Sequence, residues 1–536
     1  MDEASNFVPT AISFFYTGTY DPNYFVNPPA YSYLLHGLFA LWFRDTGHAY
    51  ATDPTAVFEL ARAASAVLGT AAVGFVYLTG ARLFDRRAGF LAALVMAVSF
   101  LPVFYSHLAL NDVPALLPLT ISMYGSAGVL MYGRLRDFAI AGAGVGIAAA
   151  TKYTAGICLL PLLTAAALQA TAPERRRTVL RGAALALGLA ALAFVAANPY
   201  SLGSFGQFWS DVRSQESTAG FGKLGLEYDS GLSYYAWVLT WGLGWVPLAA
   251  SLVGAVALAA RDWRRALFLV PLPVLFMLYM GVQERYFGRW LLPAFPALAL
   301  LAGYAVVWAA DRFGRTVRLR TALLAGAGVL LAAQGLVYTV HVDRVLARPD
   351  TRQLARDWME GAVPARAKVV VEPVVPDSWF SEQGSLRNLP PARARRLTPG
   401  GRLWVKFPTG RTQLDTKGRL LPGGKARILR PEDYERILRP SLIRTYERGG
   451  YCWVMIGSTQ YGRALAAPGE VPGAIAYYRE LARRGELVHR EDPYRPGKGP
   501  ERFNFDWSFD YYPLSYERPG PTVLIYRLRG AACGRP

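Results

Sequence analysis

The chain has 536 residues, of which 53% are hydrophobic, a mean hydropathy of +0.20 and a formal net charge of +19. This hydropathy argues against a soluble globular protein and favours a polytopic α-helical membrane protein. The excess of Lys and Arg need not indicate nucleic acid, because in membrane proteins these residues collect in cytoplasmic loops and near anionic headgroups. We expect no cleavable signal peptide, since acidic residues follow Met1 directly.

The first 33 residues combine an acidic pair with a turn rich in Pro and Tyr. Asp2 and Glu3 open the chain, and a short amphipathic segment leads to Asp21-Pro22 and then to Pro28-Pro29-Ala30-Tyr31. Carboxylates beside a bilayer are costly unless they face water or a substrate. Here they could take a proton from an acceptor hydroxyl or hold a divalent cation. The alternative is that Asp2 and Glu3 are two N-terminal charges exposed to solvent, without a role in a site.

Apolar runs of spanning length, about 20 residues each, follow one another as far as residue 340. The tract from Phe138 to Gln169 is too long for one span and short for two. Because the loops before and after it, 134–137 and 174–181, are both basic, we expect it to cross twice and to turn at Thr151-Lys152-Tyr153. The ten predicted spans are 59–80, 88–105, 113–133, 138–151, 153–171, 179–197, 233–259, 265–282, 290–310 and 319–340.

The loops between these spans alternate in charge, and the alternation predicts their side of the membrane. Basic loops, which mark the cytoplasmic side, are 82–87, 134–137, 174–181, 261–265 and 311–320. The exoplasmic face then receives Asp2-Glu3, Asp112, Lys152, the loop 198–232, Glu284-Arg285-Tyr286 and the chain from His341 onward. The same count places Met1 outside, so we expect a first transmembrane helix to be missing from this sequence. The alternative is a protein of ten spans with both termini outside.

From Asp343 onward the composition is that of a soluble domain of mixed α/β type. The predicted domains are therefore a multi-span domain, 1–340, and an exoplasmic α/β domain, 341–536. Cys452 and Cys533 could pair if the second domain lies outside the cytosol, whereas Cys158 lies in an apolar run and is expected to be buried. Predicted helices are 351–361, 431–449 and 472–485, predicted strands are 368–372, 403–407, 451–456 and 522–527, and predicted loops are 378–401, 408–430 and 490–520.

Several charged residues on the predicted outer face suit a phosphorylated substrate. Asp112 starts a span directly before a Val-Pro pair, where it also suits a helix N-cap. Lys152 lies at the predicted turn, and Arg285 and Arg289 flank Tyr286. Alternatively, Lys152 reaches to the membrane–water interface, and the two arginines belong to a belt of aromatic and basic residues there. Lys and Arg suit a phosphate, carboxylates suit a hydroxyl nucleophile or a metal, and grooves between helices suit a lipid tail. Together they indicate a lipid-linked phosphate with a polar head.

These motifs resemble those of the GT-C membrane glycosyltransferases, specifically the glycosyltransferase 39 or protein O-mannosyltransferase-like group, which includes the lipid A aminoarabinose transferases. The resemblance extends over most of residues 1–340, and the tail, at 350–355, Tyr461 and 521–526, is similar to bacterial members with an outer C-terminal domain. The features that carry it are Asp2-Glu3-Ala4, Pro28-Pro29-Ala30-Tyr31, His107–Pro114, Thr151-Lys152-Tyr153, Glu284-Arg285-Tyr286 and Leu292–Pro296. Family members normally have a span just before the Asp-Glu pair, and this sequence does not.

The resemblance implies transfer of a hexosyl or pentosyl group from a polyprenyl phosphate to an acceptor outside the cell membrane, with inversion at the anomeric carbon. It implies that Asp2 is the base, that Glu3 is its neighbour in the acceptor site, and that Asp112 shapes the site through Lys152 or a cation. Asp2 and Asp112 are the candidate ligands if a divalent cation, Mg²⁺ or Mn²⁺, is used. The implied donor phosphate site is Lys152, Arg285, Tyr286 and Arg289, and the implied substrate loop contains Tyr20, Asp21, Pro28, Pro29 and Tyr31.

Two other classes of protein remain compatible with the sequence. A transporter or flippase of lipid-linked precursors would need charged or broken segments near the bilayer midplane, whereas the charges here lie at loop edges. A membrane-anchored protein that binds glycan or lipid would work through its Arg-rich C-terminal domain. The expected partners of the enzyme are a polyprenyl-phosphate sugar, membrane lipids and an acceptor that is protein, lipid or glycan, with no nucleic acid.

Overall fold

The computed structural model describes residues 3–52, 54–219, 224–225, 230–364, 366–373, 404–407, 434–504 and 511–533. The chain divides into two compact units. The first unit consists of Met1–Phe221 and Ser230–Thr339, and the second of Gly222–Asp229 and Val340–Pro536. The predicted fold class is confirmed, because the first unit is a bundle of apolar helices and the second is a mixed sheet with helices.

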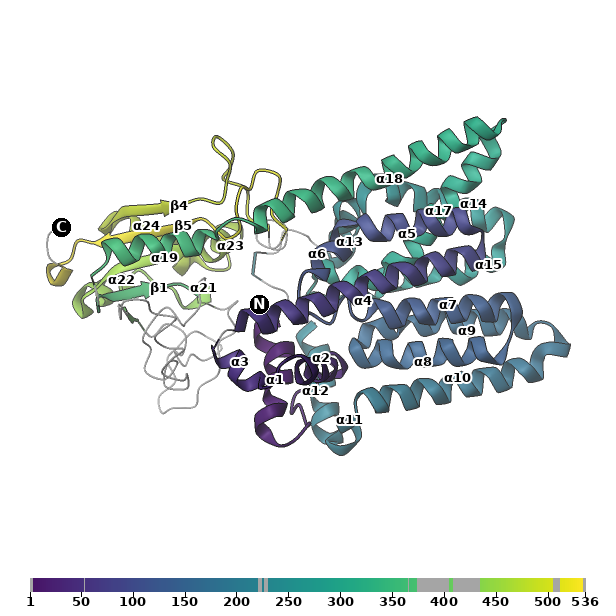
Figure 1. Ribbon diagram of the computed structural model, residues 1–536. Helices are drawn as coiled ribbons and strands as arrows, with labels where there is room; N and C mark the ends of the chain where they lie inside the picture. The colour runs from purple at the N-terminus through teal and green to yellow at the C-terminus, as the bar shows by residue number, and fades with distance from the viewer. Residues whose placement is uncertain are drawn as a thin grey trace. The chain divides into compact units, whose positions relative to one another are not determined.

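In the first unit, long helices lie side by side (Figure 1). Within the described residues, seven helices are long and apolar enough to cross a membrane, and α5 with α6, bent by 58°, would make an eighth. The helices are α4 (Pro54–Leu83), α5 (Arg86–Val98), α6 (Phe100–Ser106), α7 (Leu116–Tyr132), α8 (Leu135–Thr151), α9 (Leu159–Ala170), α10 (Arg176–Ala197), α13 (Gly231–Leu239), α14 (Trp245–Arg261), α15 (Trp263–Leu269), α16 (Pro271–Gly281), α17 (Phe295–Phe313) and α18 (Val317–Leu346). Short 3₁₀ or π segments join several of them, namely η2 (Tyr153–Cys158), η3 (Pro173–Arg175), η4 (Thr240–Gly244) and η5 (Gly288–Ala294).

All ten predicted spans overlap helices, and the ambiguous tract turns where its flanking charges predicted. α8 ends at Thr151, Lys152 has an extended backbone (φ −152°, ψ 119°), and η2 begins at Tyr153. α7 and α8 have only 17 residues each, somewhat less than the ~20 that a bilayer requires, which is why the number of helices of spanning length is lower than ten.

Small residues bring α8 close to its neighbour α10. A Cβ atom on Gly142 would lie 2.2 Å from the Ala186 carbonyl oxygen, and one on Gly146 would lie 2.2 Å from the Ala190 carbonyl oxygen. Contacts this short require glycine, as in other tightly packed membrane helices. The two glycines therefore fix the position of α8, whose end carries Lys152.

Short helices surround the end of the bundle that carries the chain's N-terminal segment. They are η1 (Glu3–Phe7), α1 (Val8–Thr17), α2 (Ala30–Trp42), α3 (Thr46–Thr52), α11 (Tyr200–Gly203) and α12 (Phe205–Ala219). The prediction that 198–232 is a loop is wrong over α11 and α12. This segment is too polar to span a membrane, but Phe208 of α12 packs edge-on against Phe25, with ring centroids 5.8 Å apart. An amphipathic helix is stable there because one face is covered.

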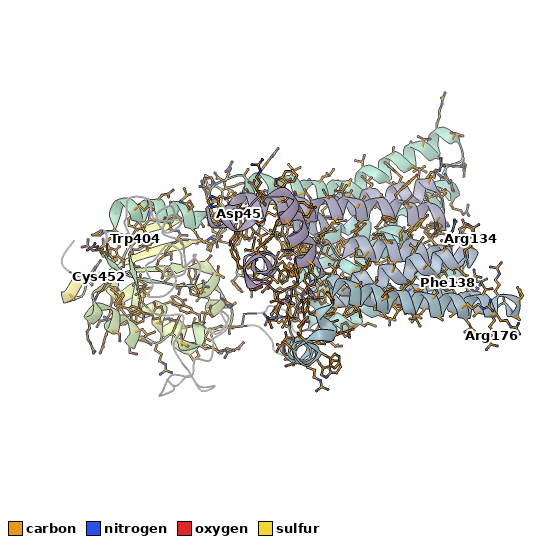
Figure 2. All side chains as sticks on the ribbon, turned by 60° about the horizontal axis from the view of Figure 1, so that its bottom comes forward. Asp45, Arg134, Phe138, Arg176, Trp404 and Cys452 are labelled. Carbon is orange, nitrogen blue, oxygen red and sulfur yellow. A yellow bond between two sulfur atoms is a disulfide. The ribbon has the colours of Figure 1, made fainter. Side chains whose placement is uncertain are left out.

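The basic loops gather at the other end of this unit. Figure 2 shows Arg134 and Arg176 together at one end of the helices and Asp45 at the opposite end. Side-chain contacts join these loops: Arg82 Nη1 lies 3.1 Å from Asp137 Oδ1, and Arg264 Nη2 donates to the Leu168 carbonyl at 2.6 Å. The alternation of loop charge therefore corresponds to the two ends of the bundle.

In the described part of the second unit, five strands form one sheet with the order β2-β1-β3-β5-β4. β1 (Lys368–Val371) is parallel to β2 (Val405–Lys406) and β3 (Tyr451–Gly457), whereas β5 (Val523–Leu528) is antiparallel to β3 and β4 (Gly485–Glu491). Helix α19 (Thr351–Ala362) packs in one hydrophobic cluster on the sheet, and the helices α21 (Tyr434–Ile437), α22 (Ser441–Gly449), α23 (Ser458–Ala466) and α24 (Pro472–Arg484) pack in another.

Most predicted elements of this unit are confirmed, including the helices at 351–361 and 472–485 and the strands at 368–372, 451–456 and 522–527. The helix predicted at 431–449 is wrong as one element: α21 and α22 are separate, because Pro440 has no N–H to continue the first helix. β4 was missed because it is a polar edge strand. The loops predicted at 378–401 and 408–430 lie outside the described residues. Cys452 and Cys533 form a disulfide, and Cys158 is buried.

Candidate active site

The turn between α6 and α7 carries Asp112, the buried carboxylate at the centre of the site. Its side chain forms an ion pair with the Lys152 ammonium, and Arg289 Nε lies 3.8 Å from its Oδ2 atom. Next to it, Asn111 Nδ2 donates to the Thr151 carbonyl at 2.8 Å, which ties this turn to the end of α8. Three segments that are far apart in the sequence thus meet at one carboxylate, and the structure brings together three of the predicted site residues.

Local structure explains why the two cations reach Asp112. Lys152 is the extended residue between α8 and η2, so its side chain leaves the helix axis there. Arg289 lies in the first turn of η5, and its guanidinium stacks over the Phe287 ring, 4.7 Å from the centroid. The Arg285 guanidinium contacts the same ring at 5.6 Å. Tyr286 between them is buried, with its ring 4.3 Å from that of Tyr234. Lys152 and Arg289 therefore face Asp112, whereas Arg285 and Tyr286 support the segment that carries Arg289.

Among the described residues, two cations and one carboxylate meet in this cluster. One carboxylate, with 4% of its side chain exposed, faces an ammonium and a guanidinium whose side chains are 12% and 20% exposed. Charges so poorly hydrated interact more strongly than they would in water. We call Asp112, Lys152 and Arg289 the cation cluster, because it brings an ammonium and a guanidinium together at one position, an arrangement that suits an anionic group such as a phosphate.

Glu3 occupies a separate, neighbouring position. Arg62 of α4 binds it with two nitrogens, of which Nε donates to Oε2 at 3.2 Å, and the Ala109 amide donates to Oε2 at 2.9 Å. Burial raises the pKa of Glu3, but the hydrogen bonds from Arg62 and Ala109 outweigh it, so the pKa falls below its ordinary value and Glu3 is ionised at neutral pH. Glu3 thus anchors η1 to α4 and to the segment before Asp112. Asp2 lies outside the described residues.

Sequence reasoning missed Arg62, although a signal was present. Arg62 is the only basic residue in the predicted span 59–80. A charged residue inside an apolar helix needs a partner or a function, and here the partner is Glu3.

The predicted substrate loop is fixed beside Lys152 by hydrogen bonds. The Tyr153 hydroxyl donates to the Phe25 carbonyl at 2.8 Å, and the Phe25 amide donates to Asp211 Oδ2 of α12 at 2.7 Å. The Ser204 hydroxyl donates to Asp21 Oδ2 at 2.5 Å. The loop therefore adjoins the cation cluster through Tyr153 and is held on its other side by the helical segment 200–219.

The other predicted loop residues differ in exposure. Tyr20 is 53% exposed, whereas Tyr31 is buried and its hydroxyl lies 2.7 Å from Ser65 Oγ and 3.0 Å from the Ala61 carbonyl oxygen of α4. Pro28 and Pro29 immediately precede α2, where their rigid backbone suits a helix start. This geometry gives Tyr31 a packing contact with α4 and leaves Tyr20 accessible.

The described residues do not fit a divalent cation at Asp112. Among them, no group of three His, Cys, Asp or Glu side chains is arranged to hold a metal. The carboxylate oxygens of Asp112 face Lys152 and Arg289, and a metal ion there would lie beside two positive charges. Asp2, the other candidate ligand, is not among the described residues, so the chemistry below is derived from the amino acids alone.

Comparisons with known proteins agree with the motifs. Residues 28–200 match the sequence model of the dolichyl-phosphate-mannose-protein mannosyltransferase family, a segment that includes Asp112 and Lys152 but begins after Glu3. No curated protein matches the chain. ArnT from Cupriavidus metallidurans bound to undecaprenyl phosphate is similar in structure, with a TM-score of 0.50 and 14% identity over 100% of this chain and 95% of ArnT.

Two structures from Archaeoglobus fulgidus are also similar. The oligosaccharyltransferase AglB in complex with an inhibitory peptide and a dolichol-phosphate has a TM-score of 0.49 and 12% identity over 98% of this chain and 84% of AglB. The oligosaccharyltransferase in complex with Zn and sulfate has a TM-score of 0.44 and 13% identity over 95% and 69%. The predicted resemblance is thus confirmed: residues 28–200 match the dolichyl-phosphate-mannose-protein mannosyltransferase family, and the chain has the GT-C-like fold of ArnT.

Proposed function

We propose that the protein transfers a sugar from a polyprenyl phosphate to an acceptor, with inversion at the anomeric carbon, and that the cation cluster binds the donor phosphate. The observation that carries this proposal is the convergence of two cations, which reach one buried carboxylate from separate helix ends. The family match at residues 28–200 covers Asp112 and Lys152 and supports the same class of donor.

The chemistry assigns each residue a role. When the bond from the anomeric carbon to the phosphate oxygen breaks, negative charge grows on the phosphate, and Lys152 and Arg289 stabilise it without having to reorganise. Asp112 holds both cations in place. Asp2 is the proposed base that removes the proton from the acceptor hydroxyl, and Glu3, through Arg62 and Ala109, positions the segment that carries Asp2.

We further propose that the site lies on the outer face of the membrane. Arg134 and Arg176 lie at one end of the helical unit, and basic loops mark the cytoplasmic side. The Cys452–Cys533 disulfide in the second unit is typical of an oxidising compartment. Both observations support an exoplasmic site and C-terminal unit.

The test is transfer from a panel of radiolabelled polyprenyl-phosphate sugars by membranes that contain the full chain. We expect label to leave the lipid fraction with the unmutated chain and to stay there with Asp112→Asn, which no longer holds the two cations. The matched control is Asp137→Asn, the same change at a buried aspartate of the opposite end, for which transfer per folded protein should persist.

Each outcome has a distinct meaning. Equal transfer by both variants would remove the site assignment and leave the class of enzyme standing. No transfer from any donor by folded, unmutated protein would overturn the enzyme proposal and favour a transporter or a binding protein.

A further inference from the structure

A cavity of about 310 Å³ opens at the end of the bundle where the basic loops gather. It is lined by the α4–α5 junction, by α14 and α15, and by the last turns of α17. Helix α4 connects the two ends of the unit: Arg62 near its start binds Glu3, and its last residue, Leu83, directly precedes Phe84 of the cavity. Arg62 and Leu83 are 21 residues apart on this helix, a rise of about 32 Å, so the cavity is distinct from the cation cluster.

Three arginines line the cavity, namely Arg261, Arg265 and Arg312. Arg265 has an ion pair with Asp262 at 3.3 Å. Arg261 and Arg312 have no carboxylate within ion-pair distance in the part of the chain that the structure describes. Each guanidinium lies beside an aromatic ring: Arg261 is 5.9 Å from the Trp308 centroid, and Arg312 is 5.9 Å from the Phe313 centroid. Two of the three cations thus lack an anionic partner.

The two carboxylates in the lining are already neutralised by residues outside it. Asp85 accepts from the Ala88 amide at 2.8 Å as the N-cap of α5, and it binds Arg87 at 2.7 Å. Asp311 binds Arg87 at 2.9 Å and Arg320 at 3.3 Å. Among the described residues, these ion pairs engage Arg87 and Arg320 and not Arg261 or Arg312, whose exposed side chains stay accessible to an anion.

The remaining wall is apolar and aromatic. The Phe84 and Tyr304 rings lie 4.8 Å apart, and Trp308 and Val307 complete the surface. A soluble phosphate would leave this wall without a partner, whereas the glycerol and first methylenes of a lipid would cover it. Arginines beside aromatic rings at the ends of membrane helices are the usual surroundings of a lipid headgroup.

We propose that this cavity binds the phosphate of an anionic membrane lipid. Arg261 and Arg312 hold the phosphate oxygens, and Phe84, Tyr304 and Trp308 contact the adjoining part of the lipid. The proposal does not rest on the glycosyltransferase function, because none of these residues belongs to the cation cluster. By occupying the junction of α4, α14 and α17, the lipid would stabilise the end of the unit opposite the candidate active site.

The experiment measures lipid binding to the full chain purified in detergent, by native mass spectrometry, with phosphatidylglycerol and phosphatidylcholine as probes. Arg261→Gln/Arg312→Gln should weaken phosphatidylglycerol binding by about ten-fold or more, since each arginine near an anionic lipid contributes roughly 1 kcal/mol. Binding of phosphatidylcholine should not change. If the double variant does not fold, as judged by its melting temperature, Arg312→Gln alone provides the test, because Arg312 is exposed.

The matched control is Arg176→Gln/Arg177→Gln, which removes two exposed arginines from a basic segment that does not line the cavity. We expect it to bind phosphatidylglycerol normally. Equal weakening in both double variants would reveal only general charge attraction, and no weakening in either would also overturn the proposal. Displacement of phosphatidylglycerol by inorganic phosphate at low excess would assign the cavity to a soluble phosphate instead.

Discussion

Two buried aspartates in the helical unit have opposite kinds of surroundings. Asp112 faces two cations, Lys152 and Arg289, that come from separate helix ends. Asp137, of which 1% is exposed, has a single ion pair with Arg82, whose guanidinium also donates to the Tyr124 carbonyl at 3.0 Å and lies 3.6 Å from the Tyr124 ring centroid. Among the described residues, the first group joins two cations to one carboxylate, whereas the second is a balanced pair of one cation and one carboxylate.

The packing around Asp137 also differs from that around Asp112. A Cβ atom on Gly128 would lie 2.4 Å from Arg82 Nη1 and 2.5 Å from Asp137 Oδ1, so the Arg82–Asp137 pair fills its space completely and joins α4, α7 and α8. Lys152 and Arg289 instead come from the extended residue after α8 and from a 3₁₀ segment. A balanced pair between packed helices stabilises the fold, whereas cations that converge from separate helix ends are placed to meet a ligand. The predictions that follow test this distinction.

Removal of both cations from the cation cluster should have the largest effect. We expect Lys152→Met/Arg289→Met to lower kcat/KM for transfer by roughly 1,000-fold, because each group that stabilises charge on the leaving phosphate contributes about 100-fold or more when it acts alone. Arg289→Lys, which keeps the charge, should retain more activity than Arg289→Met. The measurement is transfer of radiolabelled sugar by purified protein at equal folded concentration. Transfer by the double variant at the level of the unmutated chain would contradict the assignment.

Disruption of the balanced pair should affect stability and not chemistry. Asp137→Ala leaves Arg82 buried without its carboxylate, which should lower the free energy of unfolding by about 3 kcal/mol. Thermal unfolding in detergent measures this loss, and the transfer rate per folded molecule should stay within about two-fold of the unmutated rate. A stable variant that has lost transfer would show that Asp137 belongs to the functional site and would remove the distinction between the two aspartates.

Much of this arrangement could be predicted from residue types and their order. The basic loops before and after the tract 138–169 predicted that it forms two spans with a turn at Lys152. This prediction was possible because the charge of a loop depends on the side of the membrane and not on the details of packing. The convergence of Asp112, Lys152 and Arg289 agrees with their predicted place on one side of the membrane. The helix α19 and strands β1, β3 and β5 followed from apolar periodicity.

Other features depend on contacts that a linear sequence does not display. The partner of Glu3 is Arg62, 59 residues away, and the pairing requires α4 to pass beside η1. Helix α12 is polar enough to be predicted as a loop, and it is covered because Phe208 packs against Phe25, Tyr153 and Phe194. β4 is an edge strand with polar side chains, so its pattern carries little hydrophobic signal. In each case tertiary contacts, and not local preference, decide the structure.

The second unit extends the comparison to a buried acid that, among the described residues, neutral donors and not a cation hold. Glu372, just after β1, is fully buried, and neutral donors hold it: the Tyr478 hydroxyl at 2.6 Å and the Gly457 amide at 2.8 Å. Arg463, the nearest buried cation, is paired with Glu435 at 3.0 Å. Burial therefore raises the pKa of Glu372 from 4.5 to about 8.

This raised pKa predicts that the second unit loses stability as the pH rises. Between pH 4.5 and about 8 the folded protein keeps a proton on Glu372 that the unfolded chain has released, so the free energy of unfolding is highest below this window and falls across it. Hydrogen exchange of β3 in the full chain, corrected for the intrinsic effect of pH, should show protection falling about ten-fold between pH 5.5 and 8.

Glu372→Gln should remove most of this fall, since the Tyr478 hydroxyl can turn to accept from the new amide. Asp137→Asn, in the other unit, is the control and should leave the pH dependence of β3 unchanged. An equal fall in the protection of β3 with Glu372→Gln would mean that a different group titrates over this pH range. It would contradict the inference that burial keeps Glu372 protonated.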